Sequence, residues 1–177
     1  MRGERMEEWL VVDGYNVIGA WPELRQLKRF NLAAARDRLT DILSEYAAYT
    51  AQRVVVVFDA QHVPGRGEHE SSEYLSVIFT DAEETADECI ERLVGKLRDP
   101  YRRRLFVATS DYVEQRITFG RGALRISARE LLQAVQRAET SVSRKVEDMK
   151  LERTTLGQGL SEEVKRRLEQ LRRRQQS

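Results

Sequence analysis

The chain has 177 residues, and a composition that is 33% charged and 41% hydrophobic is typical of one globular domain with its own core. Its apolar stretches are far shorter than the roughly 20 residues of a membrane-spanning helix. No apolar segment follows the basic N-terminus as it would in a secretion signal, so we expect no membrane partner. A single cysteine excludes an internal disulfide framework and favours a cytoplasmic location.

The net charge of +1 conceals an asymmetry between the two halves of the chain. Residues 98–177 hold 19 basic and 11 acidic side chains, whereas residues 1–97 hold 11 basic and 18 acidic ones. This division is typical of an acidic site beside a basic surface for a polyanion, and it also occurs where helix faces are merely solvated.

Three short apolar runs each end in an aspartate. Residues 9–12, 54–58 and 105–110 are followed by Asp13, Asp59 and Asp111. A continuous apolar run closed by a turn residue is typical of a strand buried on both faces. Ligands of open parallel sheets bind at the carboxyl ends of the strands, so the three acids predict a site at that edge.

Helices and loops alternate with these strands. Helical spacing of apolar residues predicts a helix over residues 31–49 with Asn31 as its N-cap, and a second helix that begins near Ala86 and stops at residues 99–100. The remaining predicted elements are loops at residues 14–22 and 61–72, strands at residues 74–79 and 123–126, and a short helix at residues 112–119. This alternation predicts an α/β fold with a central parallel sheet between layers of helices.

The end of the chain has a different character. Ser127 and Glu130 have the spacing of a capping box, which predicts the start of a long helix. Residues 154–159 have the composition of a linker, and residues 161–175 predict a basic helix with one apolar stripe. We therefore predict a domain over residues 7–150, and a linker with a basic C-terminal helical tail over residues 151–177.

A fourth acid joins the edge defined by the strand ends. Asp87 falls in the first turn of the predicted helix near Ala86, and the topology brings it to the edge that carries Asp13, Asp59 and Asp111. Carboxylates gathered in one place repel one another unless a cation compensates their charge. No His or Cys stands at zinc-ligand spacing, and oxygen ligands favour Mg²⁺ or Mn²⁺. Such an ion activates water and offsets charge on a phosphodiester.

Each acid also has a structural explanation. Asp13 can be a turn residue, Asp59 can begin an ordinary loop, and Asp87 can simply stabilise a helix N-terminus. Asn16 can cap a turn or orient Asp13 through its amide group, and the two interpretations are equally supported. Acids at three strand ends and one helix start are harder to explain by turns alone, which favours a functional site.

Basic and aromatic residues near this edge suit a nucleic-acid ligand. Arginines that flank the strand at residues 105–110 would contact phosphates without choosing a sequence. The candidates are Arg116, Arg121, Arg125 and Arg129. Tyr15 and Trp21 can stack on bases or pack in the core. The sequence has neither a P-loop nor a dinucleotide fingerprint, so we expect no organic cofactor.

Five stretches of the sequence together resemble a known family. They are residues 12–16 (VDGYN), 57–60 (VFDA), 84–88 (ETADE), 108–112 (ATSDY) and 119–131 (FGRGALRISAREL). In this order they resemble the YacP-like NYN domain family of PIN-like nucleases. The resemblance covers residues 9–150 and implies a PIN-like three-layer α/β/α sandwich.

The resemblance also implies an activity and partners. It implies a metal-dependent endoribonuclease that acts on messenger RNA together with the ribosome. The family's acids fall on Asp13, Asp87 and Asp111, with Asp59 and Asn16 in support. Our hypothesis is that Asp13 and Asp87 hold Mg²⁺ or Mn²⁺ and that Asp111 completes the site. The alternatives are a non-catalytic RNA or ribosome binder on the same fold, and a phosphatase.

Overall fold

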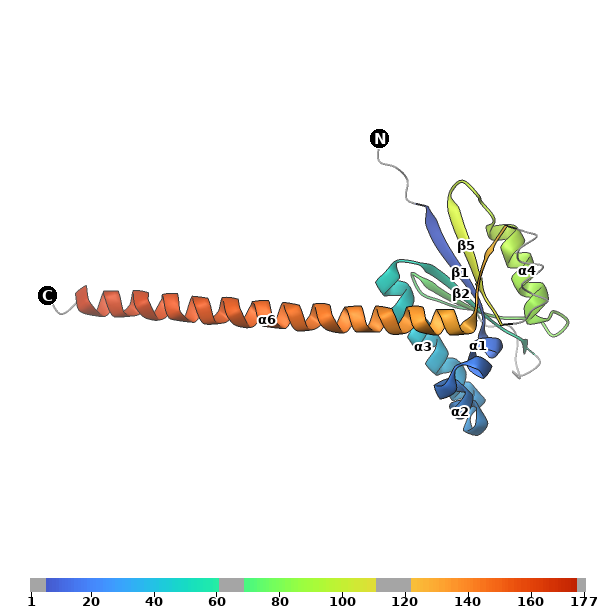
Figure 1. Cartoon of the computed structure of the whole chain (residues 1–177), viewed down its shortest axis with the longest axis horizontal. Coiled ribbons are helices and arrows are strands. Elements are labelled where there is room, and N and C mark those ends of the chain that lie inside the picture. The colour runs from blue at the N-terminus through green and yellow to red at the C-terminus, as the bar shows by residue number, and fades with distance from the viewer. Residues whose placement is uncertain (1–5, 61–68, 111–121, 175–177) are drawn as a thin grey trace. The chain divides into compact units, whose positions relative to one another are not determined.

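The computed structural model describes residues 6–60, 69–110 and 122–174 (Figure 1). The chain divides into two units, Met1–Ala138 and Glu139–Ser177. The strands are β1 (Glu7–Asp13), β2 (Arg53–Phe58), β3 (His69–Ser71), β4 (Leu75–Phe79), β5 (Arg103–Ala108) and β6 (Leu124–Ile126). The helices are α1 (Gly14–Ala20), α2 (Pro22–Phe30), α3 (Leu32–Thr50), α4 (Ala86–Leu97) and α6 (Ala128–Arg174).

The strands form one sheet in the order β3-β4-β2-β1-β5-β6. Five of them run parallel, and β3 pairs antiparallel with β4. Asp13 at the end of β1 is in register with Val57 of β2, and Val12 is in register with Ala108 of β5. The parallel strands β1, β2, β4 and β5 therefore end together, and this carboxyl edge collects the segments that follow them.

Helices cover both faces of the sheet (Figure 1). The alternating side chains of β1 explain why, because Leu10 and Val12 belong to one core cluster and Val11 belongs to another. The first cluster packs against α1, α2, α3 and the start of α6, and the second packs against α4. This arrangement confirms the predicted α/β sandwich with a parallel central sheet. No helix of the described residues is both long and apolar enough to span a membrane.

Several local predictions are confirmed by capping contacts. The side chain of Asn31 accepts a hydrogen bond of 3.0 Å from the backbone of Ala34, so Asn31 caps α3. The backbone N–H of Ser127 donates to the Glu130 carboxylate at 2.7 Å, and that of Glu130 donates to the Ser127 hydroxyl at 3.2 Å. This capping box opens α6 where the sequence predicts it.

Within the described residues, three predicted segments have a different structure, and the predicted helix at residues 112–119 lies outside those residues. The predicted loop at residues 14–22 is helical, because Asp13 caps α1 and Pro22 occupies the first turn of α2. The predicted loop at residues 61–72 contains β3, a three-residue edge strand too short to show a pattern. The predicted linker at residues 154–159 lies within the continuous helix α6, since good helix formers flank Gly157 and Gly159.

Candidate active site at the carboxyl edge of the sheet

Asp13 occupies the junction between β1 and α1. Its backbone is extended, and its side chain accepts a hydrogen bond of 3.1 Å from the backbone N–H of Asn16. The side chain is partly buried. Asp13 is thus the N-cap of α1 and not the plain turn residue of the structural explanation, and its position at the end of a central strand also places it at the carboxyl edge.

Gly14 allows the backbone after Asp13 to lie directly against the Phe58 ring. A Cβ at this position would overlap atoms Cε1 and Cδ1 of the Phe58 ring. The ring is fully buried at the end of β2 and has no room to withdraw. A side chain at position 14 would therefore displace the ring, so packing favours glycine directly after Asp13.

Asn16 connects two segments that are far apart in sequence. Its side-chain carbonyl accepts a hydrogen bond of 2.8 Å from the backbone N–H of Ser110, two residues beyond the end of β5. Its own backbone N–H donates to Asp13. Asn16 therefore joins the Asp13 turn to the segment that leads to residue 111. Its bond to Asp13 comes from the backbone and its side chain bonds Ser110, so a role in orienting Asp13 through the amide group stays a prediction.

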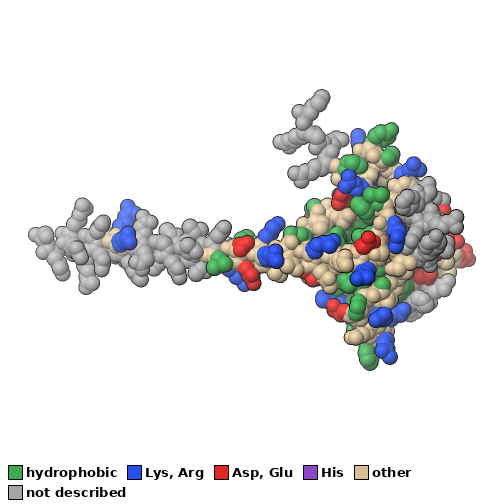
Figure 2. All heavy atoms as spheres, viewed as in Figure 1, with side chains coloured by type: hydrophobic (Ala, Val, Ile, Leu, Met, Phe, Trp, Pro, Cys, Tyr) green, Lys and Arg blue, Asp and Glu red, His purple; other side chains and the backbone are tan. Residues whose placement is uncertain are grey.

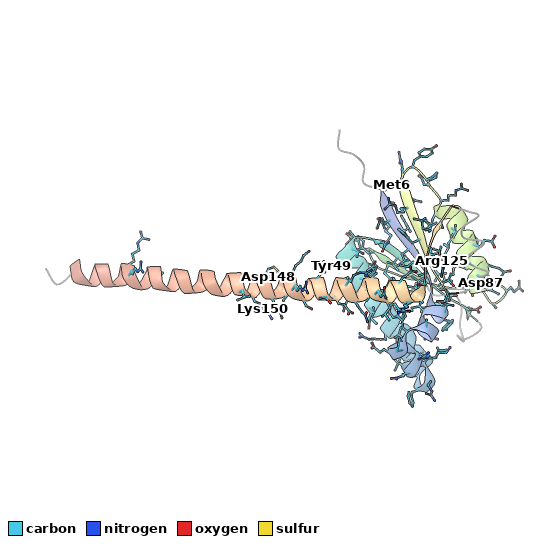
Figure 3. The ribbon with its side chains drawn as sticks, in the orientation of Figure 1. Met6, Tyr49, Asp87, Arg125, Asp148 and Lys150 are labelled. Atoms are coloured by element: carbon cyan, nitrogen blue, oxygen red, sulfur yellow. The ribbon has the colours of Figure 1, made fainter. Side chains whose placement is uncertain are left out.

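Asp59 and Asp87 also lie at this edge. Asp59 follows β2 directly and is partly buried, and the next backbone N–H, that of Ala60, donates to the buried hydroxyl of Thr80 at 2.9 Å. Asp87 is exposed in the first turn of α4 (Figure 3). This helix opens with a capping box between Thr85 and Glu88.

An ion pair holds the segment before α4. The Arg92 guanidinium donates two hydrogen bonds of 2.8 Å to the Glu84 carboxylate. These bonds hold the pKa of Glu84 below its ordinary value. Because the carboxylate is already occupied, Glu84 fixes the approach to Asp87 and is a poor candidate for a metal ligand.

The oxygen atoms available at this edge suit a hard cation, although the described side chains are not grouped around one point. Asp13, Asp59 and Asp87 offer only carboxylate oxygens, which suit Mg²⁺ or Mn²⁺. Within residues 6–60, 69–110 and 122–174, no three acidic, histidine or cysteine side chains are grouped closely enough to hold an ion. Asp111, the third predicted ligand, lies outside the described residues. The metal site therefore stays a prediction.

The predicted phosphate-binding arginines are only partly described. Arg125 lies exposed on β6, in register with Val107 (Figure 3), and Arg129 is exposed in the first turn of α6. Since α6 begins just after the end of β6, Arg129 lies at the carboxyl edge. Arg116 and Arg121 lie outside the described residues. On the face shown in Figure 2, described basic and acidic side chains are interspersed with hydrophobic ones.

The two aromatic candidates have separate roles. The Trp21 indole N–H donates to the backbone carbonyl of Ala128 at 2.7 Å, and the ring is buried, so Trp21 is a core residue. Tyr15 is partly buried, and its hydroxyl accepts a hydrogen bond of 3.0 Å from Arg36 on α3. Sequence reasoning missed Arg36. Arg36 directly follows a run of three alanines and precedes two further charged residues, and this local pattern does not distinguish it from a solvated helix face.

Comparison with known proteins gives consistent results. The model of the YacP-like NYN domain matches residues 10–173. The YacP protein of Bacillus subtilis (strain 168) is 47% identical over 164 residues, which are 93% of this chain and 96% of that protein. A crystal structure of Rae1 (YacP) from Bacillus subtilis superposes with a TM-score of 0.72 at 47% identity, covering 93% of this chain and 94% of that one. A mutant of the same protein gives a TM-score of 0.71 at 46% identity, covering 80% and 83%.

Proposed function

The chain belongs to the YacP-like NYN domain family of PIN-like nucleases, and from this premise we propose that it is a metal-dependent endoribonuclease. Its substrate is RNA, and specifically messenger RNA in association with the ribosome. Family membership supports a nucleic-acid substrate, and the resemblance noted in the sequence supports the narrower choice.

One observation at the site carries the proposal. The hydrogen bond between Asn16 and Ser110 joins the turn after β1 to the segment after β5, across 94 positions of sequence. A simple cap for α1 would need only Asp13 and the backbone of Asn16. The additional bond is expected where two neighbouring strand ends must hold their side chains in a fixed relation.

The proposed roles follow from the chemistry of each side chain. Asp13 and Asp87 hold Mg²⁺ or Mn²⁺, Asp111 completes the site, and Asp59 supports it. The ion, when bound, supplies an activated water and offsets charge on the phosphodiester. Asn16 positions both strand ends. The arginines at residues 116, 121, 125 and 129 hold the RNA backbone through contacts that carry no sequence preference.

The decisive experiment measures cleavage of RNA by Asp13→Asn and Asp87→Asn. Each change keeps the size of the side chain and removes the charge that a divalent ion needs. We expect each to lower the cleavage rate by roughly 10²- to 10⁴-fold, which corresponds to several kcal/mol of transition-state stabilisation. Asp41→Asn, an exposed acid on α3, is the matched control and should cleave like the unaltered protein. EDTA should abolish activity, and Mn²⁺ should restore it.

The alternatives give different results in the same assay. A non-catalytic binder forms a salt-sensitive complex with RNA that EDTA does not affect, and it releases no product at high protein concentration. A phosphatase releases inorganic phosphate from small esters. Full cleavage by both variants in the presence of metal would show that the acids are wrongly assigned.

The ribosomal part of the proposal needs a separate measurement. New RNA 5′ ends should be sequenced from cells that make the protein, cells that lack it, and cells that make Asp13→Asn. The proposal expects ends that depend on Asp13 and that lie within translated regions. Ends that persist when translation initiation of the same message is blocked would contradict a role for the ribosome.

A further inference from the structure

A cluster of aromatic side chains and one arginine lies at the same edge as the acids. Tyr15 follows the Asp13-Gly14 turn directly, and Phe58 and Phe79 are the last residues of β2 and β4. Arg36 lies in the second turn of α3. Because the C-terminal end of α3 leads back to the amino end of β2, its first turns lie near the carboxyl edge.

The contacts within this cluster are specific. The Arg36 Nη1 group donates to the Tyr15 hydroxyl at 3.0 Å, and the guanidinium carbon lies 6.0 Å from the centroid of the Phe79 ring. The Phe58 ring stacks on Phe79 with centroids 5.5 Å apart, and Tyr15 tilts against Phe58 at 5.2 Å. The guanidinium is therefore held in place by a phenol and a ring, and Nη1 is the nitrogen for which a hydrogen bond is seen.

The charge of Arg36 has no acidic counterpart in the described part of the chain. Arg38, Arg92, Arg103 and Arg104, by contrast, each pair with an acid. Arg36 is partly buried, and a cation withdrawn from water costs free energy unless an anion approaches it. The planar guanidinium has five N–H donors, so its remaining donors match the paired oxygens of a phosphate.

We infer that Arg36 binds a backbone phosphate of the RNA substrate and that Tyr15 fixes the orientation of its guanidinium. The inference rests on the proposed function for the identity of the ligand. It assigns a task to a residue on the acid-rich half of the chain, outside the four arginines that the sequence suggested. Arg36 is on this view a residue that seats the substrate close to the acids.

The test measures binding of a short fluorescent single-stranded RNA by anisotropy, in EDTA, over a range of salt concentrations. Arg36→Gln should weaken binding about tenfold and reduce the slope of log Kd against log salt by about 0.7, the value for one phosphate contact on a single strand. Arg36→Lys should keep the slope and lose about threefold in affinity, because it keeps the charge without the planar fork. Tyr15→Phe removes the hydroxyl that holds the guanidinium and should weaken RNA binding about threefold.

Arg38→Gln is the matched control, since Arg38 lies two residues away on the same helix and pairs with Glu23 at 3.0 Å. It should change affinity less than about twofold. Thermal unfolding checks that each variant folds. If Arg36→Gln does not fold, the affinity of Arg36→Lys provides the test. In the cleavage assay, Arg36→Gln should raise KM and leave kcat nearly unchanged, as expected for lost ground-state binding.

The outcomes separate this inference from the proposed function. If the unaltered protein never cleaves RNA but Arg36→Gln lowers affinity and slope as stated, the phosphate site stands and the nuclease proposal fails. If the unaltered protein cleaves while Arg36→Gln binds and cleaves like it, the nuclease proposal stands and the phosphate site is wrong. Failure of the unaltered protein to bind the RNA at low salt overturns the inference as well.

Discussion

The two edges of the sheet use charged residues in opposite ways. At the amino edge, Glu7 pairs with Arg103 at 3.4 Å and Glu8 pairs with Arg104 at 3.2 Å. The Trp9 indole donates to Glu7, which together with the charge of Arg103 lowers the pKa of that carboxyl. At the carboxyl edge, by contrast, acids follow the strand ends, and the arginine beside them contacts a phenol and a ring.

This contrast shows that a run of basic residues in the sequence does not by itself indicate an anion-binding surface. Arg103 and Arg104 belong to a run of three arginines at residues 102–104, and a basic run of this kind is typical of a phosphate-binding surface. In the structure the first residues of β1 and β5 are in register, and this places each arginine opposite an acid. Arg103 and Arg104 are therefore already paired with acids of the neighbouring strand. A single arginine without a matching acid is the better candidate for binding an anion.

The largest effect is expected at the turn that carries Asp13. Gly14→Ala would push a methyl group into the buried Phe58 ring, so we expect the free energy of unfolding to fall by about 1–3 kcal/mol. RNA cleavage should fall more than stability alone explains, because the Asp13 carboxylate moves with the turn. Urea unfolding and the cleavage rate measure the two effects. Gly19→Ala, where the added Cβ meets nothing within 4 Å, is the control and should be neutral or stabilising.

The next effect concerns the bond between strand ends. Asn16→Ala removes the acceptor for the Ser110 N–H, and we expect about 1 kcal/mol of lost stability and a roughly 10- to 100-fold loss of cleavage. Asn16→Asp keeps an acceptor at the same place and should be less damaging to stability. An Asn16→Ala variant with normal cleavage would mean that the two ends are held by other contacts.

A smaller effect depends on pH and concerns Cys89 in α4. Burial raises the pKa of the thiol from its ordinary value of 9.0 to about 11. The buried thiol ionises less readily in the folded state than in the unfolded state. Its contribution to the free energy of unfolding is therefore complete below pH 9 and is lost as the pH rises toward 11. The free energy of unfolding should therefore fall between pH 9 and 11, and that of the Cys89→Ala variant should fall less steeply over the same interval. Parallel slopes for the two proteins would contradict this account.

The smallest effect is expected at the amino edge. Arg104→Gln removes one exposed ion pair with Glu8, which is worth less than about 1 kcal/mol. RNA binding and cleavage should be unchanged, including their salt dependence. A clear loss of RNA affinity would break the contrast between the edges, since it would show that this pair also contacts the substrate.

The sequence predicts the parts of this fold that local chemistry determines. Apolar runs closed by Asp13 and Asp59 are strands because both of their faces are buried, and the caps at Asn31 and Ser127 specify helix starts within one residue. The same patterns predict which acids share an edge. Asp87 reaches it because its helix begins after a strand that is parallel to the others.

Long-range contacts explain what the sequence does not predict. The three residues of β3 become a strand only because β4 offers them partners. The helix α1 forms despite Gly14 and Gly19, since Asp13 caps it and the core buries Val17 and Ile18. The role of Arg36 depends on Tyr15, 21 positions earlier, and no periodicity in the sequence encodes that contact.

The bond between Trp21 and Ala128 has a consequence for how the protein is made. The core that supports α1 also needs Leu131 and Val135, which are synthesised after every strand. During translation, the strand ends that carry Asp13 and Asp59 cannot be locked in place until the first turns of α6 have left the exit tunnel. In a nascent chain the candidate site is therefore expected to stay unassembled until the start of α6 has emerged, when the first unit is already fully synthesised.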